Sequence, residues 1–176
     1  MNAIELTDVR TLRERARQHV EQGAVTEGYS ADRDKILTLL NEALATELVC
    51  ALRYKRHYFM ASGIKASVAA DEFLEHATQE AEHADRLAER IVQLGGEPDF
   101  NPDNLSKRAH AQYVAGSTLK EMVLEDLVAE RIAIDSYREI IQYIGEKDPT
   151  TRRIFEDILA QEEEHADDMA DLLKGL

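Results

Sequence analysis

Two copies of one short pattern, Glu-x-x-His, are the residues of this sequence best placed to do chemistry. They are Glu80 with His83 and Glu162 with His165, and the other four histidines have no glutamate three residues before them. Residues i and i+3 of an α-helix emerge on nearly one face, so a carboxylate and an imidazole at this spacing can reach the same metal ion. The pattern therefore predicts metal ligands carried on helices.

A lone glutamate precedes each pattern at almost the same distance. Glu47 stands before Glu80, and Glu130 stands before Glu162 at a spacing only one residue shorter. A tyrosine follows each of these glutamates after seven residues, Tyr54 in one case and Tyr137 in the other. The two halves of the chain therefore look like copies of one helical hairpin.

Burial and charge decide whether these residues bind metal. Each candidate interrupts an otherwise apolar helical stripe, which predicts that its side chain faces the core. Two divalent cations would neutralise the four glutamates, whereas four bare carboxylates in a core would be severely unfavourable. A single Glu-x-x-His on an acidic helix is usually a solvated face, but two matched copies favour a pair of buried metal ions. The six candidate ligands are Glu47, Glu80, His83, Glu130, Glu162 and His165.

Four long helices are expected to position these candidates. Apolar spacing and flanking residues predict helices over about 30–63, 67–94, 117–145 and 148 almost to the C-terminus. Ser30 is the expected cap of the first helix, and Asp148 followed by Pro149 begins the fourth. The linking residues 97–116 hold two of the three prolines, with room for a short helix over 105–114.

The lengths of the connections predict the topology. Tight links join helices one and two and helices three and four, so each pair should be antiparallel, whereas the link over 97–116 can cross the length of the bundle. The expected fold is an all-α four-helix bundle, up-down-down-up, with one long crossover between helices two and three. It would occupy residues 30–176, with residues 1–29 as an N-terminal extension.

The extension carries a short amphipathic pattern. Val9, Leu12, Ala16 and Val20 follow helical spacing, and the segment holds four arginines and five acidic residues. An arm that binds DNA would be strongly basic, so a contact between subunits or a surface helix is the better interpretation.

Composition excludes several classes of partner. The 176 residues include 21 basic and 35 acidic side chains, a net charge of −14, which repels DNA and acidic membrane surfaces, although this excess alone indicates only a soluble surface. One cysteine excludes an internal disulfide framework. No apolar run reaches the roughly 20 residues of a membrane span, and residues 1–20 resemble no signal peptide, so we expect a cytoplasmic protein.

Over residues 31–174 the chain resembles bacterioferritin and the wider ferritin-like di-iron superfamily, whose four-helix bundles carry this carboxylate and histidine pattern. The segments 80–91 and 126–130 are particularly similar. The resemblance implies a ferritin-like fold and a site that holds two irons in each chain.

The resemblance also implies a role for each candidate. Glu80 and Glu162 would bridge the two irons. Tyr54 matches the family's tyrosine near the site and is the expected catalytic side chain. The other ligands would divide between the irons as Glu47 with His83 and Glu130 with His165.

Three departures from bacterioferritin shape the expected assembly. Ala81 stands where bacterioferritins have the methionine that binds haem, so no haem is expected. Only the segment 166–176 follows His165, which is too short for the fifth helix of 24-subunit ferritins. The link between helices two and three is longer than in bacterioferritin. These last two features resemble Dps-like miniferritins and favour a 12-subunit cage over a 24-subunit one. Typical Dps proteins, however, build their iron sites between subunits, whereas this chain carries a complete set itself.

The expected function is that of a ferroxidase, which oxidises Fe(II) to Fe(III) with dioxygen or hydrogen peroxide. It would serve iron storage and detoxification in a hollow homo-oligomeric cage. The alternatives are a di-metal oxygenase or manganese catalase without storage, and a helical bundle that binds structural zinc. A rubrerythrin-like peroxidase is disfavoured because its additional iron needs four cysteines and this chain has one.

Further residues remain open from sequence. Asp126 either orients a ligand histidine or is an ordinary surface acid. Tyr137 is more typical of a core tyrosine than of a functional one. His57, His76 and Glu75 could serve iron transit, but surface roles are favoured.

Overall fold

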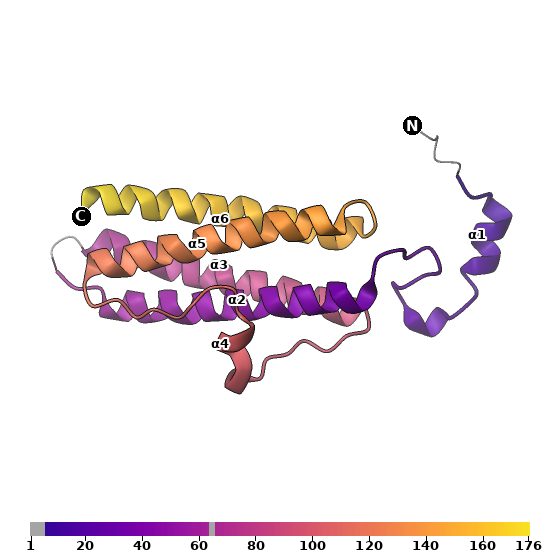
Figure 1. Cartoon of the computed structure of the whole chain (residues 1–176), viewed down its shortest axis with the longest axis horizontal. Coiled ribbons are helices and arrows are strands. Elements are labelled where there is room, and N and C mark those ends of the chain that lie inside the picture. The colour runs from indigo at the N-terminus through magenta and orange to yellow at the C-terminus, as the bar shows by residue number, and fades with distance from the viewer. Residues whose placement is uncertain (1–5, 64–65) are drawn as a thin grey trace.

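Four long helices packed side by side make up the body of the molecule (Figure 1). This computed structural model describes residues 6–63 and 66–176. Within those residues all regular structure is helical, which confirms the all-α prediction. The four helices of the bundle are α2 (Arg33–Met60), α3 (Ala66–Gln93), α5 (Leu119–Ile144) and α6 (Pro149–Gly175).

The direction of the helices agrees with the predicted topology. Helix α2 packs most extensively on α3, and α5 packs most extensively on α6. Figure 1 shows that α3 and α5 run in the same direction, whereas α2 and α6 run in the opposite one. The segment between α3 and α5 travels the length of the bundle, so the up-down-down-up arrangement with one long crossover is confirmed.

Side-chain caps set the helix beginnings. Asp148 caps α6 as predicted, and its carboxylate accepts the Thr151 backbone N–H at 3.0 Å. The prediction of Ser30 as the first cap is wrong, because Asp32 caps α2 and accepts the Lys35 N–H at 3.2 Å. The carboxylate of Asp32 lies beside the unpaired amides of the first turn, and its negative charge suits the helix N-terminus.

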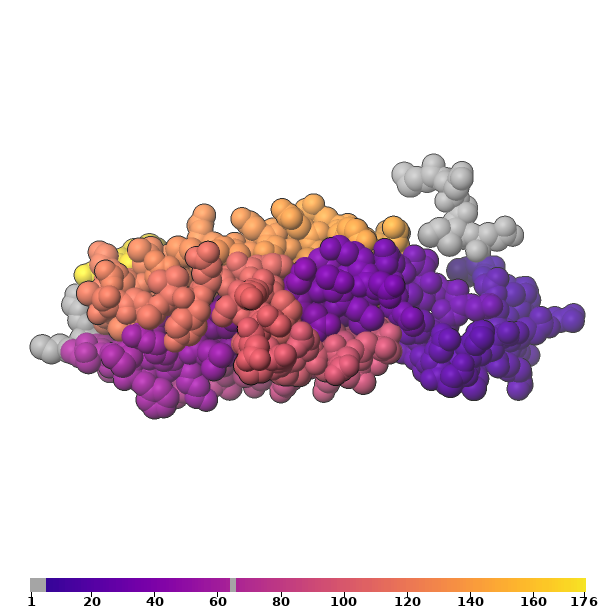
Figure 2. Space-filling view, turned by 60° about the horizontal axis from the view of Figure 1, so that its bottom comes forward, coloured from indigo at the N-terminus to yellow at the C-terminus, as the bar shows by residue number. Residues whose placement is uncertain are grey.

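The crossover contains less helix than the predicted 105–114. Its helical parts are a 3₁₀ turn, η2 (Pro102–Asn104), and one turn of α-helix, α4 (Leu105–Arg108). Beyond α4 the backbone bonds to α2 instead of to itself: the His110 N–H donates to Thr46 Oγ1 at 2.9 Å, and Arg53 donates to the Gln112 carbonyl at 2.9 Å. These bonds hold the crossover against α2, and Ala111 packs with Cys50 of α2 and Ala129 of α5, so the crossover covers this face of the bundle (Figure 2).

The N-terminal segment projects beyond one end of the bundle (Figure 1). Its helix, α1 (Val9–Arg15), is shorter than the amphipathic pattern, because Val20 lies in a separate 3₁₀ turn, η1 (Val20–Gln22). None of the side chains of α1 is buried. Val25 and Tyr29 pack against the core of the bundle. The division into residues 1–29 and 30–176 stays a prediction, and residues 1–5 of the extension lie outside the described residues.

The core of the bundle consists of two large apolar clusters. One includes Leu40, Leu87, Ile140 and Phe155, toward the end where α2 begins. The other includes Phe73, Val123 and Met169, toward the end where α2 finishes. The sequence-predicted metal ligands lie at intermediate positions along the same four helices, so apolar side chains enclose them from both ends. No helix among the described residues is long and apolar enough to cross a membrane.

Candidate metal centre

The six predicted ligands come together in the middle of the bundle as two overlapping groups. In each group, one ligand atom from every member lies within 4.8 Å of the others. Glu80 and Glu162 belong to both groups, as a bridging pair would. The first group is completed by Glu47 and His83, and the second by Glu130 and His165.

Both histidines direct the same ring nitrogen into the centre. His83 Nδ1 lies 3.1 Å from Glu47 and 3.0 Å from Glu162. His165 Nδ1 lies 3.4 Å from Glu80 and 4.0 Å from Glu162. Two ligand atoms bound about 2.0–2.2 Å from one ion are separated by about 3–3.5 Å, so these spacings suit shared coordination.

The donor atoms of the centre are buried and incompletely paired. All six side chains are at most 2% exposed. In the part of the chain that the structure describes, four of their buried atoms have no hydrogen-bond partner: Glu80 Oε1, Glu130 Oε2, Glu162 Oε1 and His165 Nδ1. Buried polar atoms without partners are costly. Carboxylates and imidazoles are suitable ligands for iron, manganese and zinc, so the unpaired atoms fit divalent metal ions.

The clustered carboxylates perturb each other's ionisation. Burial, together with the charge of Glu80, raises the pKa of Glu47 to about 8. The same two causes raise the pKa of Glu162 well above its ordinary value. Burial acts to lower the pKa of His165, but contacts with Glu130 and Glu80 raise it to about 10. Protons and divalent cations are thus alternative ways to neutralise the same carboxylates.

Two buried tyrosines hold the two glutamates that are not shared. The Tyr54 hydroxyl donates a hydrogen bond to Glu130, and the Tyr137 hydroxyl donates one to Glu47. Both tyrosines are fully buried. The sequence favours a functional role for Tyr54 and not for Tyr137, yet the structure gives the two tyrosines equivalent positions. A catalytic role for Tyr54 stays a prediction.

Two glutamines that sequence reasoning missed hold the histidines. His83 Nε2 lies 2.8 Å from Gln161 Oε1, and His165 Nε2 lies 2.6 Å from Gln79 Oε1. An Nε2–H bonded to an amide oxygen leaves Nδ1 as the free nitrogen that faces the centre. A signal was present in the sequence, because each glutamine immediately precedes the glutamate of a Glu-x-x-His pattern.

Neither sequence interpretation of Asp126 is right. It is fully buried, so it is not a surface acid, and it does not touch a candidate ligand histidine. Its carboxylate instead accepts from Arg53 Nε at 2.7 Å and pairs with His57 Nδ1 at 2.7 Å. The His57 Nε2 lies 2.9 Å from the Ala115 carbonyl of the crossover. Asp126 and His57 therefore fasten the crossover to α2 and α5, and His57 is not a surface residue.

His76 is also buried rather than exposed, at 1% exposure. Its ring stacks on that of His165, with centroids 4.0 Å apart and planes 22° apart. Together with Glu72 and Asp168 it forms a third group of possible metal ligands. Glu75, the other transit candidate on α3, is exposed and accepts a bond from Gln79 at 3.4 Å.

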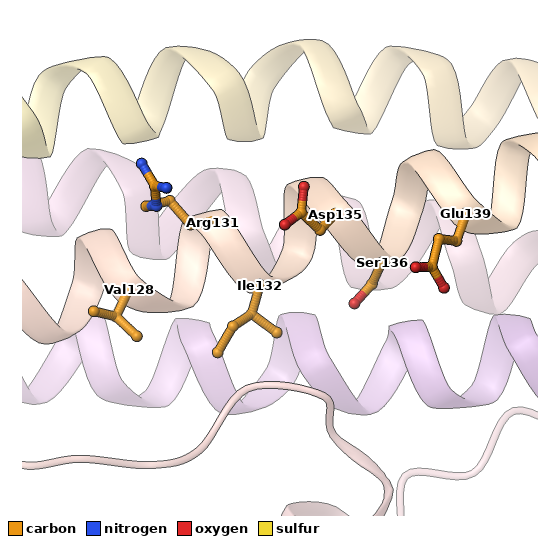
Figure 3. Close-up of a pocket in the computed structure, with 6 residues that line it drawn as sticks. All are labelled: Val128, Arg131, Ile132, Asp135, Ser136 and Glu139. Atoms are coloured by element: carbon orange, nitrogen blue, oxygen red, sulfur yellow. The ribbon is translucent and has the colours of Figure 1, made fainter.

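A broad surface hollow lies apart from the centre, along an outward face of α5. Figure 3 shows the side chains that line it, with Val128 and Ile132 directed one way and Arg131 and Asp135 the other. None of the six predicted ligands lines this hollow. The hollow therefore does not belong to the metal centre.

Comparisons with known proteins find relatives in sequence and in fold. The ferritin-like domain model matches residues 37–176. A bacterioferritin of Mycobacterium avium is 32% identical over 134 residues, which cover 76% of this chain and 80% of that protein. The dodecameric thioferritin of Bacteroides fragilis, a bacterioferritin-related protein, has a TM-score of 0.79 at 32% identity, covering 82% of this chain and 87% of its own. Dps from Thermosynechococcus elongatus has a TM-score of 0.76 at 23% identity, covering 80% and 90%, a likeness of fold alone.

Proposed function

The chain belongs to the ferritin-like family, and on that premise we propose that it is a ferroxidase with a paired iron site inside each chain. Its substrate would be Fe(II), and its oxidant dioxygen or hydrogen peroxide. The supporting observation is the pair of buried ligand groups that share Glu80 and Glu162. A cytoplasmic location, as expected from the sequence, remains part of this proposal.

The residues present suit two divalent ions with one set of ligands each. Glu47 and His83 would hold one ion, Glu130 and His165 the other, and the shared glutamates both. Two Fe(II) ions held by these neighbouring ligand sets would supply two one-electron donors side by side. The tyrosine hydroxyls keep Glu47 and Glu130 oriented, and the glutamines keep both Nδ1 atoms directed inward.

Pairing of the iron sites balances the electrons of the reaction. Oxidation of two Fe(II) to two Fe(III) releases two electrons. These electrons and two protons convert one dioxygen to hydrogen peroxide, or one hydrogen peroxide to two waters. A paired site therefore avoids release of a one-electron-reduced oxygen species.

Replacement of the shared glutamates tests the paired site. Glu80→Ala and Glu162→Ala should each abolish fast Fe(II) oxidation, measured by stopped-flow absorbance of Fe(III). The loss should exceed the ~10–100-fold that removal of an outer partner of a metal ligand causes. Glu82→Ala and Glu164→Ala are matched controls, because these exposed glutamates lie two residues further along the same helices. Wild-type rates in both shared-glutamate variants would refute the assignment.

Iron storage requires an enclosed assembly, and we infer a cage of 12 subunits rather than 24. The related protein from Bacteroides fragilis, which is 32% identical to this chain, is dodecameric. Iron retained after loading with Fe(II) and oxidant, together with mass from analytical ultracentrifugation, tests this inference. Dozens of irons per chain in a 12-subunit particle would support storage. About two irons per chain would leave an oxidase without storage.

A further inference from the structure

A third group of ligand-capable side chains lies beside the paired centre. Glu72 and His76 come from α3 and Asp168 from α6, and one ligand atom of each lies within 4.8 Å of the others. His76 Nε2 is 3.4 Å from Asp168 Oδ2 and 3.7 Å from Glu72 Oε2. These separations are close to the ~3–3.5 Å between two ligands of one ion.

The buried imidazole of His76 directs Nε2 toward two carboxylates that lie 3.4 and 3.7 Å away. The side chain is 1% exposed, and Nδ1 has no hydrogen-bond partner within residues 6–63 and 66–176. Among the described residues, Nε2 has only the two carboxylates at charge-pair distance. Burial of a poorly paired polar group is costly. The carboxylates remain partly open to solvent, with side-chain exposures of 34% for Glu72 and 45% for Asp168.

The internal repeat does not explain this group. When the two Glu-x-x-His patterns are aligned with each other, the positions that correspond to Glu72 and His76 hold Ile154 and Ile158. In the same alignment, the position that corresponds to Asp168 holds Arg86. The other side of the centre therefore has two apolar residues and an arginine where this side has ligands.

The group stands between solvent and the second half of the paired centre. A surface hollow is lined by Val68, Glu72, Asp168 and Leu172, among others. On its inner side the His76 ring stacks on His165 at 4.0 Å and meets the Tyr54 ring edge-on at 5.2 Å. A cation held by this group would thus be separated from the paired centre by one layer of side chains.

We propose that Glu72, His76 and Asp168 form a third, mononuclear site for a divalent first-row metal ion. As a delivery site it rests on the proposed function: Fe(II) would be captured from solvent here and passed inward past His165. One imidazole nitrogen and two carboxylates suit Fe(II), Mn(II), Co(II) or Zn(II) better than Ca(II), which prefers oxygen ligands alone. The repeat-related side has Arg86, which pairs with Asp157 at 2.9 Å, where this side has Asp168, so the delivery site serves only one side of the centre.

Anaerobic calorimetry with Co(II) tests the site without any oxidation step. Glu72→Gln with Asp168→Asn removes two anionic ligands. Asp71→Asn with Asp167→Asn is the matched control, because these neighbouring acids are exposed and the change of charge is the same. The salt concentration should be about 0.15 M or higher, where exposed acids are screened beyond ~8 Å.

Wild type and control should bind about three Co(II) per chain, and the site variant about two. Equal stoichiometry in wild type and site variant would overturn the third site. If wild type and control bind only one Co(II) per chain and the site variant binds none, the third site is kept and the paired centre is refuted.

The rate of Fe(II) oxidation tests delivery. With oxygen and a low Fe(II) concentration, the site variant should oxidise Fe(II) about tenfold more slowly than the control, and its rate should approach that of the control at saturating Fe(II). Equal rates at low Fe(II) would refute delivery.

Discussion

At the scale of single residues, the two halves of the chain hold each other's candidate ligands. Tyr54 and Gln79 come from the first hairpin, and they bond to Glu130 and His165 of the second. Tyr137 and Gln161 of the second hairpin bond in the same way to the first. The ligand orientation therefore depends on docking of the two hairpins, and neither hairpin can preorganise the centre alone.

The equivalence of the two tyrosines gives one prediction. Tyr54→Phe and Tyr137→Phe should each weaken anaerobic Co(II) binding about tenfold or more, because a hydrogen bond to a charged group contributes ~1.5–3 kcal/mol. Calorimetry measures this, with Tyr143→Phe, a half-exposed tyrosine on α5, as the control. If only Tyr54→Phe slows Fe(II) oxidation and Co(II) binding is unchanged, Tyr54 has the distinct catalytic role expected from the sequence.

The two glutamines give a prediction of the same kind with a directional result. Gln161→Leu frees His83 to rotate, and Gln79→Leu does the same for His165. Each substitution should weaken the binding of one of the two paired ions by ~10–100-fold and leave the affinity for the other nearly unchanged. Calorimetry resolves the two events, and Gln142→Leu, an exposed amide on α5, serves as the control. Unchanged affinities in both variants would show that the glutamines do not position the histidines.

At the scale of elements, the start of α6 joins three parts of the chain. The carboxylate of Asp148 accepts from Thr151 in its own helix, from Arg90 of α3 at 2.9 Å, and from the Tyr29 hydroxyl at 2.9 Å. Burial and the bond to Asp148 raise the pKa of Tyr29 to about 12. One side chain thus fixes the end of the bundle where α3 finishes and α6 begins.

Removal of this carboxylate should lower stability in a pH-dependent way. Burial acts to raise the pKa of Asp148, but hydrogen bonds from Thr151 and Tyr29 lower it below its ordinary value. A lowered folded pKa means that the stabilisation is complete at neutral pH and is lost as pH falls below about 4. Asp148→Ala should cost about 0.5–2 kcal/mol at pH 7 for the cap alone. Asp148→Asn keeps a capping oxygen, so its free energy of unfolding in urea should fall less than that of Asp148→Ala. The difference in unfolding free energy between Asp148→Asn and wild type should shrink at pH 3.5. A difference independent of pH would contradict the charge argument.

At the scale of the whole molecule, a polar centre divides the apolar core. The clusters at the two ends contain residues from all four long helices, and the six candidate ligands lie between them. Converging carboxylates disfavour this arrangement, and bound cations favour it. Metal binding should therefore stabilise the entire bundle rather than one helix.

Metal removal should lower the melting temperature of the protein. Ligand at about 100 times its Kd adds ~2.7 kcal/mol, which for a chain of this size corresponds to about 5–10 °C. Differential scanning calorimetry with Co(II) or with chelator measures the shift. Glu80→Ala with Glu162→Ala should lose most of the shift while keeping a folded bundle, because it removes two buried carboxylates. A full shift in that double variant would place the stabilising metal elsewhere.

The sequence by itself determined the bundle, its topology and the set of six residues that converge. Helix spacing and link lengths are local properties, and Glu47, Glu80 and Glu162 interrupt apolar stripes whose inward direction follows from the helical period. Convergence of the six then follows from two antiparallel helix pairs of matched length.

Only the tertiary structure decided which side chains meet across helices. Asp126 pairs with Arg53 and His57 because α5 packs beside α2 and the crossover, and no pattern along one helix contains that register. The burial of His76 likewise depends on where α6 lies against α3. Partners on different elements are set by side-chain packing in three dimensions, whereas spacing along one helix predicts only the face on which a residue stands.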